Sequence, residues 1–119
     1  MWRYVATILI AMTQMPVAAV AEPSVNEFLK LYDSAKPDGR VIFELAIRHT
    51  FEGIAWVNAY LHRTNQELYC APSQIALLDA QLIDMLRRES KAFPENGKAP
   101  YGLALLLVSI KSFPCKNSN

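Results

Sequence analysis

Two histidines are the side chains of this chain best suited to acid–base or metal chemistry. His49 and His62 fall in one stretch expected to be helical, but not at the i, i+4 spacing that lets two imidazoles share a metal ion. Glu52 follows His49 by three positions and Asn58 precedes His62 by four, so each histidine has a polar neighbour along its helix. A histidine–carboxylate pair can act as a general base, yet such pairs on helix surfaces mostly contribute modest stability. We therefore expect both histidines to be structural.

Familiar catalytic motifs do not occur in the printed sequence. It contains no Gly-x-Ser-x-Gly elbow, no glycine-rich phosphate loop and no His-Glu-x-x-His zinc motif. The carboxylates are scattered singly, which gives no signal of a paired-carboxylate site. The sequence predicts a protein that is not an enzyme and that uses no cofactor and no metal.

The N-terminal segment has the three regions of a secretory signal peptide. Arg3 supplies a positive charge, residues 5–12 form a short apolar run, and residues 19–21 match the small-x-small pattern cut by signal peptidase. The alternative is a membrane anchor, but the apolar run is about half of the roughly 20 residues that span a bilayer. We expect cleavage of residues 1–21, no membrane insertion afterwards, and one mature domain over residues 22–119.

Export changes what the composition implies. The chain has 12 basic and 11 acidic residues, and losing Arg3 balances these charges. A neutral domain argues against nucleic acid or an anionic membrane as partner, since both select basic proteins. Cys70 and Cys115 are the only cysteines, and an even pair in an oxidising compartment normally forms a disulfide. We predict that bridge, worth roughly 4 kcal/mol in the chain-entropy model.

Helical periodicity begins directly after the expected cleavage site. A first helix opens at Ser24, with Glu27 in the capping-box position, and ends near Lys36–Gly39. A second runs from about Arg40 to Arg63, with apolar residues at three-four spacing. Gly53 lies in its middle, where glycine costs about 1 kcal/mol against alanine, so we expect close packing or a kink there.

Two further helices follow. The third is expected to start at Pro72 or Ser73, and its apolar stripe consists of Ile75, Leu78, Leu82, Met85 and Leu86. A proline-bracketed break over residues 93–100 precedes a fourth helix from about Pro100 to Ser112. That helix is apolar almost all round, so it is either central to the bundle or shared with a second subunit. The sequence predicts an all-α fold: a small four-helix domain stapled by one disulfide.

Surface recognition has two candidates in the sequence. Trp56, Tyr60 and Tyr69 are large aromatics with polar tips, which anchor protein interfaces but more commonly fill the cores of small bundles. The loop between Pro94 and Pro100 is by default an ordinary helix connection, but its rigid bracketing also suits insertion into a partner's cleft. The predicted partner-binding residues in that loop are Glu95, Asn96, Gly97 and Lys98.

The chain resembles the Rap/Tai family of immunity proteins, which protect bacteria against type VI secreted toxins. The resemblance covers roughly residues 40–116. It rests on Gly53, the Tyr-Cys-Ala-Pro segment at 69–72, the amphipathic helix from Ile75 to Leu86, and the closing Phe-Pro-Cys at 113–115. It implies a periplasmic protein that binds and inhibits a cell-wall-degrading effector, often a peptidoglycan amidase, and often as a homodimer. The matching motifs specify a fold and transfer no toxin-contacting residue.

Two other functional classes stay open on the sequence. One is an acid-stress periplasmic chaperone, which would unfold at low pH and expose apolar helix faces to clients. The acidic residues would lose their charge in acid and leave the chain strongly positive, which is compatible with such a mechanism. The other is a structural or accessory subunit of an envelope complex.

Overall fold

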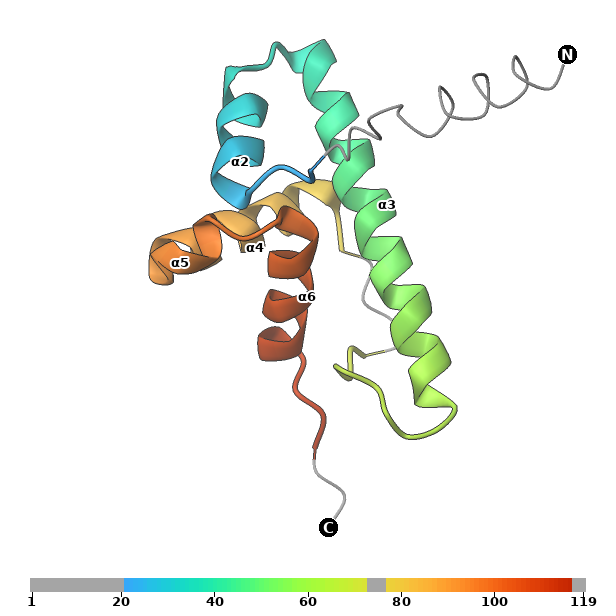
Figure 1. The fold of residues 1–119 in the computed structure, drawn as a ribbon. Coiled ribbons are helices and arrows are strands. Elements are labelled where there is room, and N and C mark those ends of the chain that lie inside the picture. The colour runs from blue at the N-terminus through green and yellow to red at the C-terminus, as the bar shows by residue number, and fades with distance from the viewer. Residues whose placement is uncertain (1–20, 73–76, 117–119) are drawn as a thin grey trace, which may run out of the picture.

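The computed structural model describes residues 21–72 and 77–116, and these form an all-α fold. The helices are α2 (Val25–Ser34), α3 (Pro37–His62), α4 (Asp79–Ala92), the four-residue α5 (Pro94–Gly97) and α6 (Tyr101–Ser112). In Figure 1, α3 forms one edge of the molecule and the other helices lie on one side of it. The predicted four-helix domain is thus confirmed, with α5 as an added single turn. The predicted signal peptide lies outside the described residues, apart from Ala21.

The capping box predicted at the start of α2 is present. The Glu27 N–H donates to the Ser24 hydroxyl at 3.3 Å, and the Ser24 N–H donates to a Glu27 carboxylate oxygen at 2.9 Å. Two backbone bonds join this end of the chain to the start of α6: the Val25 N–H donates to the Ala99 carbonyl at 3.0 Å, and the Tyr101 N–H to the Pro23 carbonyl at 3.1 Å. The N-terminus of the domain is therefore fixed against its last helix.

Helix α3 begins at Pro37 rather than at about Arg40, so the residues expected to end the first helix instead open the second. Proline fits the first turn of a helix because its missing N–H would have no intrahelical partner there. Helix α2 ends at Ser34, and Ala35 and Lys36 alone connect the two helices. The sequence identified the break between these helices but placed the start of α3 too late.

Helix α4 begins at Asp79, so the prediction of a start at Pro72 or Ser73 is wrong; Ile75 lies outside the described residues. The N-terminal turn is held by Gln81, whose side-chain oxygen accepts the Leu78 N–H at 2.8 Å. Leu78 precedes the helix and is 67% exposed, whereas the other predicted stripe residues Leu82, Met85 and Leu86 are buried.

The core lies between α2, α4, α6 and the middle of α3. Phe28 stacks on Tyr101 with ring centroids 4.7 Å apart and meets Phe43 edge-on at 5.6 Å. The largest fully buried side chains include Ile47, Leu82, Leu86 and Leu105. Helix α6 contributes Ala104, Leu105 and Val108 to this core, so the structure favours the central position for it. Across the described residues, no helix combines the length and apolarity needed to cross a membrane.

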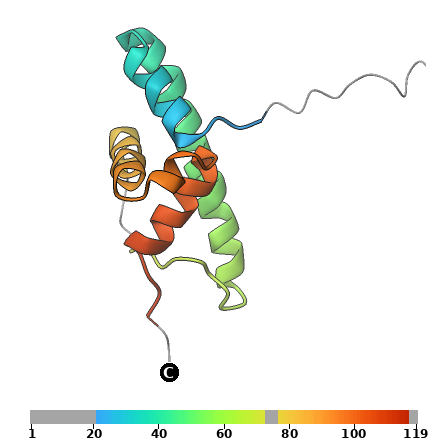
Figure 2. The same cartoon turned by 60° about the vertical axis from the view of Figure 1, so that its left-hand side comes forward.

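Three ion pairs connect α4 to its neighbouring helices. Arg87 pairs with Asp33 of α2 at 2.7 Å, Asp79 pairs with Arg48 of α3, and Glu89 pairs with Lys111 of α6. In Figure 2, α4 and α6 lie beside each other along the lower part of α3, and α2 overlaps the upper part of α3. Each pair uses a carboxylate, so acid removes one charge from every one of these helix contacts.

The predicted disulfide is present. Cys70 and Cys115 are bonded with an S–S distance of 2.00 Å, and their Cα atoms lie 4.8 Å apart. Next to the bridge, the Cys70 N–H donates to the Phe113 carbonyl at 2.8 Å. The bond therefore joins the segment after α3 to the segment after α6.

Candidate functional site

Helix α3 carries an apolar face that points away from the core. It is the longest helix, yet Ile47 is its only buried residue. At 100° per residue, Ile42, Leu45, Trp56 and Tyr60 fall on the side opposite Ile47. Their exposed fractions are 71%, 42%, 77% and 69%, with Val41 and Val57 exposed at the flanks. We call these six residues the α3 ridge.

The middle of the α3 ridge is polar, and Gly53 has no side chain to project there. His49 Nδ1 lies 3.1 Å from a Glu52 carboxylate oxygen, and both side chains are more than half exposed. A Cβ placed on Gly53 would meet nothing within 4 Å, so the close-packing explanation of this glycine is wrong. An apolar hollow of about 360 Å³ borders Gly53 and Val57 and reaches Leu106 of α6. The ridge thus offers projecting side chains next to a depression.

The three aromatics singled out in the sequence divide between surface and core. Tyr69 is only 4% exposed, as the core interpretation predicted. For Trp56 and Tyr60 that interpretation is wrong, because both project from the α3 ridge. Helical spacing alone cannot separate them from the core residues, since α3 is apolar on two opposite faces.

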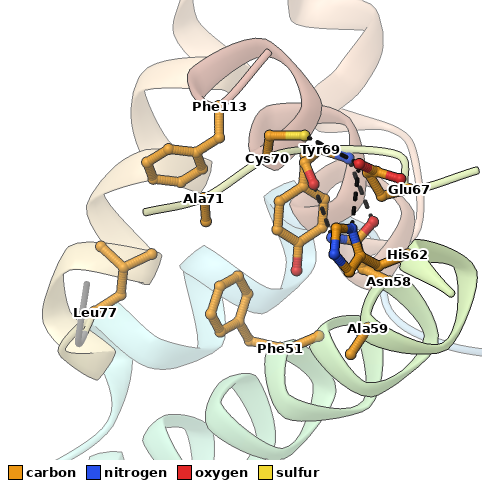
Figure 3. Close-up of a pocket in the computed structure, with 11 residues that line it drawn as sticks. Phe51, Asn58, Ala59, His62, Glu67, Tyr69, Cys70, Ala71, Leu77 and Phe113 are labelled. Carbon is orange, nitrogen blue, oxygen red and sulfur yellow. Dashed lines mark hydrogen bonds and ion pairs between the residues drawn. The ribbon is translucent and has the colours of Figure 1, made fainter. Parts of the chain in front are cut away.

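A second candidate site is a cavity of about 540 Å³ beside the C-terminal half of α3 (Figure 3). Three aromatic side chains line it: Phe51 from α3, Tyr69 from the following loop and Phe113 from the segment after α6. Burial raises the pKa of Tyr69, which keeps its hydroxyl neutral. The cavity is therefore mainly apolar and aromatic.

Glu67 places a carboxylate on one side of this cavity. One of its oxygens lies 3.3 Å from His62 Nδ1, and the other is buried without a hydrogen-bond partner among the described residues. The pKa of Glu67 lies below its ordinary value, chiefly through its own backbone N–H and then through His62, although burial acts in the opposite direction. The carboxylate is thus charged at neutral pH and only partly satisfied.

Asn58 holds the loop that forms the cavity wall. Its side-chain oxygen accepts the Leu68 N–H at 2.7 Å, and its amide donates to the Tyr69 carbonyl at 2.8 Å. The sequence paired Asn58 with His62, but in the structure His62 meets Glu67 and Asn58 meets backbone. Glu67 was missed because it lies beyond the end of α3, where helical spacing gives no information.

Within the described residues, Glu67, Cys70 and Cys115 place potential metal-ligand atoms within 4.8 Å of one another. The two sulfurs are joined in the disulfide and cannot act as thiolate ligands. Glu67 then offers a single carboxylate, one oxygen of which already lies 3.3 Å from His62 Nδ1.

The predicted partner-binding residues form a short helical corner instead of an irregular loop. Glu95, Asn96 and Gly97 belong to α5, and Lys98 caps it. The Asn96 amide donates to Glu89 at 2.7 Å, and Gly97 is buried against Asn26. Glu95 and Lys98 are exposed and remain available to a partner.

Comparisons with known proteins found no matching family model, no matching curated protein and no matching solved structure. The resemblance to the Rap/Tai immunity proteins therefore rests on the short motifs of the sequence. The α3 ridge and the Glu67 cavity are defined by this structure alone.

Proposed function

We propose that this protein is a periplasmic immunity protein that binds and inhibits a type VI secreted effector that degrades the cell wall. The observation that carries the proposal is the α3 ridge, a rigid and largely apolar surface on a small disulfide-bonded domain. The Rap/Tai resemblance supplies the class of partner, in which peptidoglycan amidases are common. The balanced charge and the signal-like N-terminus also fit a protein that acts in the periplasm.

The α3 ridge has the composition of a protein-binding surface. Exposed apolar residues that cluster on a soluble monomer commonly mark interaction sites, and Trp56, Val57 and Tyr60 form such a cluster at the C-terminal end of the ridge. Trp and Tyr are the residues most enriched at the energetic centres of interfaces, and Trp56 and Tyr60 lie one helical turn apart. Truncating such an anchor typically costs about 2–4 kcal/mol of binding, a loss of thirtyfold or more. We therefore assign effector docking to the C-terminal half of the ridge.

Co-expression tests this function. The exported protein is produced in the periplasm with the cell-wall-degrading effector encoded beside it, and lysis is followed with time. We expect protection by the natural sequence, loss of protection by Trp56→Asp, and full protection by Leu31→Asp, since Leu31 is 53% exposed on α2 outside the ridge. Continued lysis despite stable expression would refute the immunity function. Equal protection by the two variants would refute only the role of the ridge.

The homodimer expected from the sequence is also proposed, but with α3 at its interface. Helix α6 places much of its apolar surface in the core, whereas the α3 ridge is free within the described residues. Two antiparallel copies that cross near residue 51 would set Ile42 of one against Tyr60 of the other, with His49 and Glu52 close to the twofold axis. Light scattering of the complex separates the two uses of the ridge. A 1:1 complex assigns the ridge to the effector; a 2:2 complex assigns it to the dimer and moves effector contact to Glu95–Lys98.

An acid-stress chaperone is the second candidate, favoured by the ion pairs that join α4 to three other helices. Each pair loses its carboxylate charge in acid, so low pH loosens all three contacts together. This function predicts cooperative loss of helical circular dichroism near pH 2–3, together with protection of client proteins. A helical signal that survives at pH 2 would exclude it and would leave the immunity function untouched.

A further inference from the structure

Glu67 brings a histidine and the two bridged cysteines to one place. The carboxylate oxygen that lies 3.3 Å from His62 Nδ1 also lies 3.7 Å from Cys70 Sγ. The potential ligand atoms of Glu67, Cys70 and Cys115 are all within 4.8 Å of one another. Figure 3 shows Glu67 lying against both Cys70 and His62. The segment after α3 thus gathers two sulfurs, an imidazole nitrogen and a carboxylate oxygen.

From this geometry we infer that the dithiol form of the domain, in which Cys70 and Cys115 are reduced, binds a zinc ion through these two cysteines, His62 and Glu67. Thiolate, imidazole and carboxylate are the ligand types of protein zinc sites, and structural sites arrange four of them as a tetrahedron. In the oxidised form the sulfurs are bonded to each other, so only the reduced chain offers this site. The ion then joins the same two segments that the disulfide joins.

The two contacts of the Glu67 oxygen already have the lengths that a zinc tetrahedron requires. Zn–N and Zn–O bonds of about 2.1 Å set nitrogen and oxygen about 3.4 Å apart, and a Zn–S bond of about 2.3 Å sets oxygen and sulfur about 3.6 Å apart. The observed separations are 3.3 Å and 3.7 Å. Only the sulfurs must move, to about 3.8 Å from each other, after their bond is broken. The second Glu67 oxygen is buried and is not needed, because one carboxylate oxygen suffices.

This inference goes beyond the proposed function, because it concerns the reduced chain whatever its partner. Thiols are kept reduced in the cytosol, so a chain exported by a signal peptide enters the periplasm before its bridge forms. Bound zinc would keep both thiolates from pairing with other exported chains. Exchange with the disulfide of an oxidant protein then transfers two electrons from the thiolates, forms the Cys70–Cys115 bond and releases Zn²⁺, while the oxidant becomes a dithiol.

Cobalt tests the site, because tetrahedral Co²⁺ absorbs visible light strongly and its bonds to thiolates absorb in the near ultraviolet. The protein is reduced with a phosphine, freed of reductant without air, and titrated with Co²⁺ and then with Zn²⁺. We expect one tetrahedral ion per chain, which Zn²⁺ displaces with a dissociation constant below about 1 µM, as in small structural zinc sites. A dithiol form without a tetrahedral spectrum, or an oxidised form that gives the same spectrum, would overturn the inference.

Variants of the reduced protein identify the ligands. Cys115→Ser should abolish the tetrahedral spectrum, and His62→Gln and Glu67→Gln should each weaken Zn²⁺ binding about tenfold or more, the least that losing a supporting group at a metal site costs. His49→Gln is the matched control, because His49 also pairs with a glutamate, Glu52, but on the exposed α3 ridge; it should leave the affinity unchanged. Zinc affinity that is unchanged in both His62→Gln and Glu67→Gln would contradict the four-residue site, whether or not the reduced chain is folded before zinc binds.

Discussion

Replacing Lys111 by methionine should destabilise the domain through its buried partner Glu89. The Glu89 side chain is 8% exposed and pairs with Lys111 of α6, whose side chain is 47% exposed. Glu89 also accepts the Asn96 amide at 2.7 Å. Lys111 lies 3.8 Å from the centre of the Phe93 ring as well. Lys111→Met therefore leaves a buried carboxylate with one neutral hydrogen bond and no counter-charge.

The expected cost lies between two limits. Breaking a fully buried ion pair costs about 3–5 kcal/mol, whereas an exposed pair contributes about 0–1 kcal/mol. Lys111 is half exposed, the Asn96 bond remains, and methionine can still pack on Phe93. We therefore expect Lys111→Met to lower the free energy of unfolding by about 1–2 kcal/mol. Adding Glu89→Gln should recover part of this loss, because no unpaired charge is then buried.

Urea unfolding followed by far-ultraviolet circular dichroism measures these differences. Trp56 is 77% exposed, so its fluorescence would report unfolding poorly. Lys91→Met is the control, since Lys91 is an exposed lysine of α4 with no ion pair in the described part of the chain. The reasoning is refuted if Lys111→Met costs no more than Lys91→Met. It is also refuted if Glu89→Gln adds its full cost to that of Lys111→Met.

Two further predictions concern glycines and acid. Gly53→Ala should raise the free energy of urea unfolding by about 1 kcal/mol through helix propensity, because its Cβ meets nothing within 4 Å. Gly97→Ala should lower the free energy of unfolding by about 1 kcal/mol, because its Cβ would lie 2.5 Å from the Asn26 oxygen. A fall for Gly53→Ala would contradict the first prediction, and a rise for Gly97→Ala the second. Arg48 lowers the pKa of Asp79 below its ordinary 3.8, so this pair contributes stability above that pH and loses it as the pH falls through the lower folded-state value. Urea midpoints measured against pH should show Asp79→Asn less stable than the natural protein at pH 7, with a deficit that shrinks as the pH falls below 3.8. A difference that stays constant with pH would disprove the assignment.

Local signals in the sequence predicted much of the fold. The capping box at Ser24 and Glu27, the break near residues 93–100 and the Cys70–Cys115 bridge all depend on near neighbours or on simple counting. The start of α4 does not. The residue at its N-cap is the apolar Leu78, so no polar capping residue marks the position, and its first residue, Asp79, binds Arg48 from 31 positions away. A tertiary contact of this kind leaves no periodic signal.

The candidate sites were harder to predict than the fold. Trp56 and Tyr60 were recognised as possible interface residues, but their spacing also fits a core stripe, and only the position of Ile47 shows which face of α3 is buried. The Glu67 cavity combines α3, the following loop and the segment after α6, which are brought together by the disulfide and by Asn58. Such a site forms only when segments distant in the sequence come together, so residue spacing within one helix cannot predict it.

The Cys70–Cys115 bond has a consequence for proteolysis. It closes a covalent ring that contains α4, α5 and α6, while α2 and α3 lie outside the ring. A single backbone cut inside the ring, including one at the exposed α5 corner, leaves both fragments covalently joined. A cut near the exposed Asn65, which has a φ of 54°, would instead free α2 and α3 from every covalent link to the rest. A single proteolytic cut therefore leaves the domain in one covalent piece when it falls inside the ring, and divides it into two pieces when it falls in the turn that follows α3.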